Sequence, residues 1–248
     1  MSRGLLVVSA GLILTIVLFA NPASANAQTG EPDEFGWYTI TPETTKYDQL
    51  GSWTLHFRFK KPRIITTEMP GRGKKVIYYM LYELINRTGE PQTVIPKFTL
   101  RTLDKFTTHS DEISPKVQQA IIKIEDPTPD RRLNIRNSVT LSKRPILPTE
   151  PDSAPIVVRG VAIWSDVYDR APDTNQFSIF VGGLSNGVFQ GDDGVIRRKT
   201  LQLDFRRIGD ADVPKAEQIK FVDNNDPWIY RATSVNLRGD DAAPGNGQ

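Results

Sequence analysis

Apolar and polar residues alternate most regularly in residues 52–59. The apolar set is Trp53, Leu55, Phe57 and Phe59, and the polar set is Thr54, His56 and Arg58. A period of two places the two sets on opposite faces of an extended strand. The pattern therefore predicts a strand that buries its apolar set and exposes its polar set to water.

Residues 75–85 carry apolar side chains in both alternating sets, which predicts a strand covered on both faces. Residues 63–69 are predicted to be extended, and Pro70-Gly71-Arg72-Gly73 has the composition of a turn. Asn86-Arg87-Thr88-Gly89 is expected to reverse the chain, because Gly89 tolerates a positive φ. A strand at residues 93–103 follows, so the pattern predicts a β-meander over residues 52–103.

One helix is predicted over residues 114–125. Ser114 is the expected N-cap, Pro115 suits the first turn, and an apolar stripe is formed by Val117, Ala120, Ile121 and Ile124. We expect this helix to cover an open end of the sheets. Further extended segments are predicted at residues 37–40, 133–141, 156–164, 176–184, 196–207, 217–222 and 228–233.

This order of elements favours a mostly β fold, an immunoglobulin-like β-sandwich with one short helix at about residues 114–125. We assign residues 26–36 to a flexible lead-in, residues 37–235 to a single β-sandwich domain and residues 236–248 to a disordered tail. A division near residue 145 into two smaller β units stays open as an alternative.

The first residues have the pattern of a secretory signal peptide. Arg3 precedes an apolar run from Leu5 to Ala20, and the small residues Ala23-Ser24-Ala25 follow. We expect residues 1–25 to be removed after Ala25, with Ala27 as a second cleavage site and an uncleaved anchor as the alternative. No later segment approaches bilayer-spanning length, so no membrane insertion is expected after cleavage. The predicted location is the periplasm or the extracellular side of the cell envelope.

Composition excludes several classes of function. Removing residues 1–25 from the 248-residue chain leaves 223 residues and lowers the net charge from +2 to +1, because Arg3 is the only charge lost. Near-neutrality argues against nucleic acid as a partner. The chain contains no cysteine, which excludes disulfides, thiol nucleophiles and thiolate metal sites.

Candidate chemistry is sparse. The two histidines are His56, on the polar face of a predicted strand, and His109, in a predicted loop; no nucleophile-elbow motif accompanies them. Acidic residues cluster in loops at Asp126 and Asp130, Asp166 and Asp169, Asp192 and Asp193, Asp210 and Asp212, and Asp223 and Asp226. Loop carboxylates suit calcium, but their spacing is also that of ordinary turns. We therefore assign no catalytic, cofactor-binding or metal-binding residue and no cofactor.

The aromatic residues and the basic clusters each allow two interpretations, one functional and one structural. A sugar-stacking platform or a filled core would both use Tyr78, Tyr79, Tyr82, Trp164 and Trp228. A polyanion site or charged strand edges that prevent aggregation would both use the basic clusters at 60–63, 72–75, 197–199 and 206–207. The core and edge interpretations are favoured.

Several segments together resemble a set of uncharacterised exported proteins of planctomycete bacteria. They are Trp53 to Phe59 with Pro62-Arg63, Tyr78-Tyr79 through Gly89, Gly160 to Asp166, Phe180 to Gly187, Arg198 to Leu201 and Trp228 to Arg231. Residues 82–103 also resemble immunoglobulin-like accessory domains of bacterial exported proteins. The resemblance implies export and supplies no site residue.

Three functions follow from these patterns. The favoured one is a non-catalytic binding or structural module of the periplasm or cell envelope, whose partner would be another envelope protein or a polysaccharide. The alternatives are a carboxylate-dependent hydrolase acting on envelope polysaccharide or peptide, and a subunit of a surface assembly.

Overall fold

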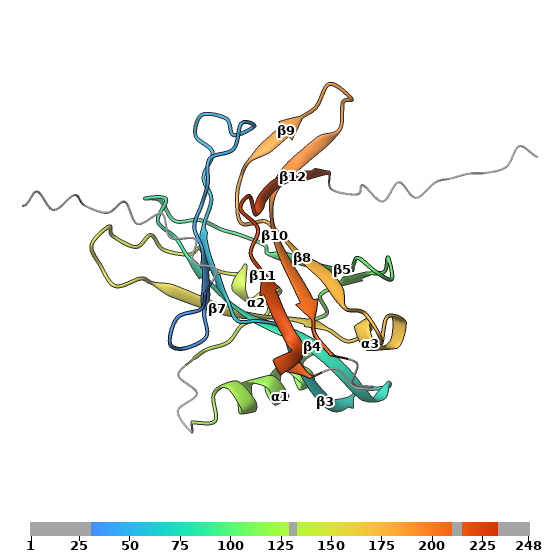
Figure 1. Cartoon of the computed structure of the whole chain (residues 1–248). Helices are drawn as coiled ribbons and strands as arrows, with labels where there is room; N and C mark the ends of the chain where they lie inside the picture. Colours follow the sequence, from blue (N-terminus) through green and yellow to red (C-terminus); the bar gives the residue numbers. More distant parts are fainter. Residues whose placement is uncertain (1–30, 129–132, 210–214, 233–248) are drawn as a thin grey trace, which may run out of the picture.

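The computed structural model describes residues 31–128, 133–209 and 215–232, which form two antiparallel β-sheets (Figure 1). The predicted signal peptide (residues 1–25) and the predicted tail (residues 236–248) lie outside these residues. No helix in the described part of the chain is long and apolar enough to cross a bilayer.

The first sheet is built around one long strand. It consists of β1 (Tyr38–Ile40), β2 (His56–Phe59), β3 (Arg63–Met69), β4 (Gly73–Ile85) and β7 (Val157–Trp164). β2 and β3 pair along one edge of β4, β7 pairs along its other edge, and β1 extends the sheet beyond β2. β4 is therefore the central strand, as its two-sided apolar pattern predicts.

A β-bulge separates β2 from β3. Phe59 lies opposite Tyr82, and Arg63 lies opposite Tyr79, so the three residues 60–62 face only two residues of β4. Pro62 has no backbone N–H to donate to the ladder, which suits this interruption. The extra residue shifts the alternation, and Ile64 thus packs against the same core as Phe59.

The second sheet surrounds β10. It consists of β5 (Lys97–Thr102), β6 (Thr108–Ser110), β8 (Gln176–Gly182), β9 (Val188–Gln190), β10 (Ile196–Arg207), β11 (Ile219–Val222) and β12 (Trp228–Ala232). β8 and β9 follow one edge of β10, and β11 and β12 follow the other. Each sheet combines strands from both sides of residue 145.

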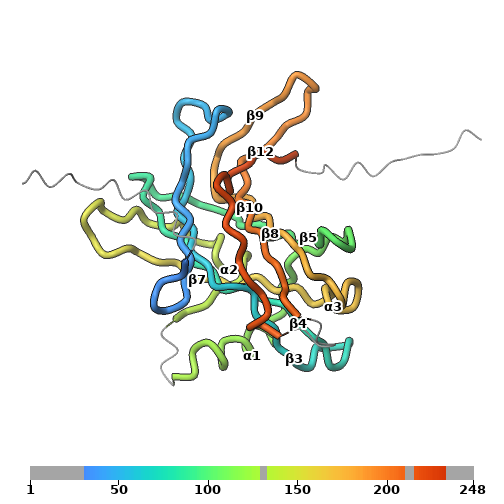
Figure 2. The backbone as a smooth tube through the Cα atoms, in the orientation of Figure 1, coloured from blue at the N-terminus to red at the C-terminus, as the bar shows by residue number. Residues whose placement is uncertain are grey.

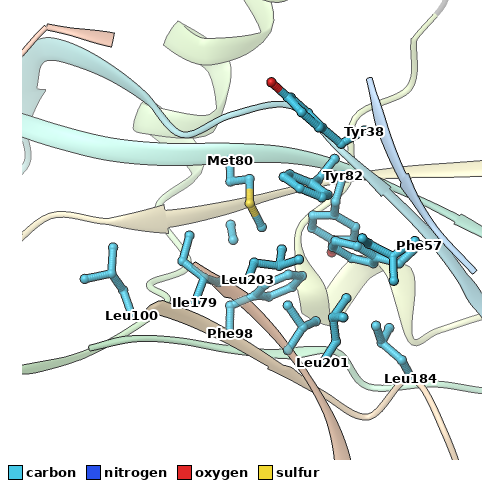
Figure 3. Close-up of a cluster of buried hydrophobic side chains, with 14 of the residues drawn as sticks. Tyr38, Phe57, Met80, Tyr82, Phe98, Leu100, Ile179, Leu184, Leu201 and Leu203 are labelled. Atoms are coloured by element: carbon cyan, nitrogen blue, oxygen red, sulfur yellow. The ribbon is translucent and has the colours of Figure 1, made fainter. Parts of the chain in front are cut away.

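The main core lies between the two sheets. Figure 3 shows Phe57 and Tyr82 of the first sheet beside Phe98, Leu201 and Leu203 of the second. The predicted alternation is confirmed for Leu55, Phe57 and Phe59, all of which are fully buried. Trp53, by contrast, is only partly buried, and the polar set of Thr54, His56 and Arg58 is half-buried rather than exposed. The ordered strand begins at His56 instead of Ser52.

A smaller core covers the outer face of the first sheet, where Ile77 and Tyr79 pack with Val117 and Ile121 of α1 (Pro115–Glu125). The two-sided burial of β4 is confirmed. The predicted helix is present, but it covers a sheet face beside β3 rather than an open end (Figure 1). Two details of the prediction are wrong: Ile124 is exposed, and the Ser114 side chain makes no capping hydrogen bond.

The chain departs from the predicted pattern in three further places. The meander ends at β4, because β5 belongs to the second sheet. The strand predicted at 133–141 is absent; the short helix α2 (Ser138–Leu141) lies there, and Asn137 and Thr140 form a reciprocal capping box at its start. α3 (Val167–Arg170) and the 3₁₀ helix η1 (Ala216–Gln218) add further turns, so the expectation of one helix is wrong.

Residues 31–36 also differ from the predicted flexible lead-in. The Asp33 carboxylate accepts hydrogen bonds from the backbone N–H groups of Phe35 and Trp37, and it pairs with Arg58 of β2. These contacts hold the segment against the first sheet.

The two sheets are joined where β8 gives way to β9. Leu55 donates its backbone N–H to the Leu184 carbonyl at 2.9 Å, and the Trp53 N–H reaches Asn186 Oδ1 at 2.7 Å. Figure 2 shows the loop of residues 41–52 at the same end of the molecule as the turn between β9 and β10, and the Tyr47 and Phe189 rings lie 4.3 Å apart there.

Substitution of Gly160 by alanine is expected to lower the free energy of unfolding by about 1–3 kcal/mol. A Cβ at Gly160 would lie 2.2 Å from Tyr82 Cζ, and the ring cannot yield because Phe57 and Phe98 pack against it. Urea unfolding measures the loss. The control is Gly182→Ala, whose Cβ meets no atom within 4 Å. An equal loss in both variants would contradict the steric argument.

Candidate functional site

A pocket of about 570 Å³ lies on the outer face of the second sheet, opposite the main core. Five strands, β5, β6, β8, β10 and β12, supply its walls. Its lining consists of Ile95, Lys97, Thr99, Thr108, Ser110, Phe180, Gly182, Gly183, Arg198, Thr200, Arg231 and Ala232. We call this the outer-face pocket.

Strand alternation and register bring the polar lining together. Lys97 lies opposite Gly182, Thr99 lies between Ser110 and Phe180, and neighbouring residues such as Phe98 point into the core. Gly182 leaves the floor hollow, since a Cβ there would meet nothing within 4 Å. The hollow therefore results from a missing side chain in an otherwise continuous face.

The charge of the outer-face pocket has one sign. Lys97, Arg198 and Arg231 line it, and none of its described lining residues is acidic. None of the three cations lies within 4.0 Å of a carboxylate of the described chain. Arg198 and Arg231 are directly opposite each other on β10 and β12. Like charges in this position destabilise a sheet. The fold thus tolerates a concentration of positive charge that an anionic ligand would relieve.

Arg231 is held in place by packing rather than by an ion pair. Its guanidinium carbon lies 4.0 Å from the centre of the Phe180 ring. Burial, and then the charge of Arg101, lowers the pKa of the Arg231 guanidinium below its ordinary value. Guanidinium groups form paired hydrogen bonds with carboxylates and sulfates, so the group is oriented for such a ligand.

Hydroxyl groups complete the lining at Thr99, Thr108, Ser110 and Thr200. They donate and accept hydrogen bonds, and the described part of the lining contains no histidine and no carboxylate beside them. The arrangement is suited to binding an anion that also carries hydroxyl groups.

The basic cluster at residues 197–199 does not form a single patch. Arg197 pairs with Asp193, Lys199 is buried against Asp48, and only Arg198 faces the outer-face pocket. The sequence did contain Arg198 as a candidate, whereas Lys97 and Arg231 were missed. Lys97 and Arg231 join Arg198 only through the register of β5, β8, β10 and β12, which the spacing of residues in the sequence does not reveal.

The sugar-stacking platform proposed as an alternative is excluded. All of its members are buried, with exposed fractions of 4% or less: Tyr78, Tyr79, Tyr82, Trp164 and Trp228. The interpretation of these aromatic residues as core is confirmed.

The histidines lie elsewhere. His109 is buried in β6 rather than in a loop, with Nδ1 2.8 Å from Asp166 Oδ1 and Nε2 2.7 Å from Thr107 Oγ1. These groups lie outside the outer-face pocket, and the Thr107 hydroxyl is also shared with Thr102. His56 is half-buried, and burial followed by the charge of Arg87 lowers its pKa.

Three members of the acidic pairs, Asp166, Asp169 and Asp193, pair with basic side chains. Asp169 pairs with Lys75, and Asp166 with His109 and Arg170. Asp130, Asp210 and Asp212 lie outside the described residues. Within residues 31–128, 133–209 and 215–232, no group of three or more histidine, cysteine or acidic side chains is placed to hold a metal ion.

Comparison of the chain with protein-family models, with curated proteins and with solved structures finds no match in any of the three. The charge and geometry of the outer-face pocket are therefore the basis on which a function is assigned.

Proposed function

We propose that the chain is an exported, non-catalytic binding module of the cell envelope that binds an acidic polysaccharide in the outer-face pocket. The observation that carries this proposal is the set of three cations, Lys97, Arg198 and Arg231, around one hollow whose described lining residues include no acidic side chain. Export is proposed from the signal-peptide pattern of residues 1–25 and from the resemblance to exported planctomycete proteins. An immunoglobulin-like character of the two packed sheets is part of the same proposal.

A polysaccharide fits the lining better than a simple inorganic anion would. Acidic sugars combine a carboxylate or sulfate with several hydroxyl groups, and the pocket pairs three cations with the hydroxyls of Thr99, Thr108, Ser110 and Thr200. Its volume of about 570 Å³ lies within the range of pockets that enclose small organic ligands. The two opposed arginines would grip the acid group, and the hydroxyls would contact the ring substituents.

The binding test uses polygalacturonate oligosaccharides as the acidic probe and dextran oligosaccharides as the neutral one. We expect the acidic probe alone to bind in calorimetry, with an affinity that falls as salt is added. The double variant Arg198→Gln/Arg231→Gln should bind at least about tenfold more weakly, because charged hydrogen bonds are lost. Lys116→Gln, which removes one exposed charge from α1, is the matched control and should bind normally.

A variant that keeps every charge separates shape from electrostatics. Gly182→Leu fills the hollow without contacting the protein at Cβ, so we expect it to block the probe while the midpoint of unfolding stays close to that of the wild type. Equal binding of dextran, or undiminished binding by the double arginine variant, would contradict the proposal.

A further inference from the structure

A second pocket lies on the outer face of the first sheet, beside the end of α1. Its volume is about 300 Å³, and β2, β4, β7 and the segment of residues 33–37 contribute to its walls. One wall is apolar and includes Trp37, Leu133 and Ile135, and the other is charged. We call this the inner-charge pocket, because a fully buried carboxylate lies at its base.

That carboxylate belongs to Glu83 of β4. Its side chain has no exposed surface; Oε2 accepts a hydrogen bond from Arg58 Nη1 at 2.7 Å, and Oε1 accepts one from Arg159 Nε at 2.6 Å. Arg58 also binds Asp33 through Nη2 at 2.5 Å. The Nη groups of Arg159, in contrast, have no hydrogen-bond acceptor among the described residues. One edge of the Arg159 guanidinium is therefore free to bind a ligand.

Lys60 supplies a cation that has no ion pair among the described residues. It lies in the bulge between β2 and β3, and its backbone N–H bonds to the Leu81 carbonyl at 3.0 Å. Its Nζ lies 5.1 Å from the centre of the Trp37 ring and within 4.0 Å of no carboxylate of the described chain. The half-buried position, and next the charge of Arg63, lowers the pKa of the Lys60 amine. The bulge thus places a poorly solvated ammonium group against an apolar wall.

The charges of the pocket do not balance. Among the described residues, Arg58, Lys60 and Arg159 are opposed by Glu83 and Asp33, which leaves one positive charge. Glu125 also lines the pocket, but Arg63 at 2.6 Å and the Tyr79 hydroxyl at 2.7 Å already hold its Oε1. A ligand with a single negative charge would complete the balance.

We propose that the inner-charge pocket binds a small organic monoanion with an apolar body, of the arylalkyl carboxylate class. The carboxylate would bind Lys60 and the free edge of Arg159, and the apolar body would pack against Trp37 and Leu133. This site is separate from the outer-face pocket and does not depend on the proposed polysaccharide function.

The experiment compares phenylbutyrate with phenylbutanamide, which have similar shapes and differ in charge, by calorimetry on the full chain. We expect the amide to bind at least about tenfold more weakly than the acid. Lys60→Gln should weaken phenylbutyrate binding by about tenfold or more, because a charged hydrogen bond is lost. Lys61→Gln removes the neighbouring charge, which is not part of the lining, and should leave the affinity unchanged.

A second variant, Leu133→Trp, fills the cavity while every charge remains, and we expect it to abolish binding. It also keeps the proposal falsifiable if Lys60→Gln fails to fold. Equal affinity for acid and amide, equal effects of the Lys60 and Lys61 variants, or unchanged binding by Leu133→Trp would overturn the proposal. The Arg198→Gln/Arg231→Gln variant should retain phenylbutyrate binding, which distinguishes failure of this site from failure of the outer-face pocket.

Discussion

Glu83→Gln is expected to lower the free energy of unfolding by about 3–5 kcal/mol, the loss typical when one partner of a buried ion pair is removed. The carboxylate has no exposed surface, and each of its oxygens binds a different arginine. A glutamine amide has one acceptor oxygen, and its NH₂ group would point a donor at a second donor. Urea unfolding near neutral pH measures the difference.

The control for this prediction is Glu90→Gln, the same change at an exposed position, which should stay within about 0.5 kcal/mol of the wild type. The double variant Glu83→Gln/Arg159→Gln should be less destabilised than the two single losses together, since the residues are in direct contact. A loss below about 1 kcal/mol for Glu83→Gln would show that the pair contributes no more than an exposed salt bridge.

Lys199→Met is also expected to lower the free energy of unfolding by about 3–5 kcal/mol. Lys199 is only 3% exposed. Its ammonium group donates to Asp48 Oδ2 at 2.6 Å and to the Glu43 carbonyl at 2.5 Å. The Tyr230 hydroxyl donates to the other Asp48 oxygen at 2.7 Å. Methionine keeps the length of the side chain but leaves the Asp48 carboxylate without its cation, so the loop of residues 41–52 loses its anchor on β10.

The loss of stability in Lys199→Met should depend on pH, and the direction of this dependence follows from the pKa of Asp48. Burial alone raises the pKa of Asp48, but hydrogen bonds from Lys199, Thr45 and Tyr230 outweigh it and hold that pKa below its ordinary 3.8. A lowered pKa stabilises the fold above the ordinary value, and this stabilisation is lost as the pH falls through the folded pKa. The difference between wild type and Lys199→Met should therefore be largest near neutral pH and shrink in acid.

Unfolding curves recorded near neutral pH and below the ordinary aspartate pKa test this dependence. Lys116→Met, at an exposed position of α1, is the matched control and should have little effect at either pH. A difference that grows as the solution is acidified would contradict the assignment of Asp48 as the partner.

Sequence pattern and structure agree best for strands whose bounds depend on their own residues. The bounds predicted for residues 196–207 are those of β10, and both faces of β4 are buried as its two apolar sets predict. The predicted secondary structure is wrong where contacts with neighbouring residues or strands determine the conformation. Residues 133–141 look extended, yet the capping box of Asn137 and Thr140 turns part of them into α2. The bulge at residues 60–62 becomes visible only once β4 supplies a register.

The sequence by itself determined the class of the fold and the apolar core, because a period of two in one strand is a local property that survives in any arrangement of sheets. It also excluded all thiol chemistry, since the chain has no cysteine. Only the tertiary structure decided where the charges meet. Lys97, Arg198 and Arg231 come from three strands, and Glu83 meets its two arginines across β2 and β7. Pairing between strands distant in the chain sets these contacts, and it is the packing of whole sheets that selects the pairing.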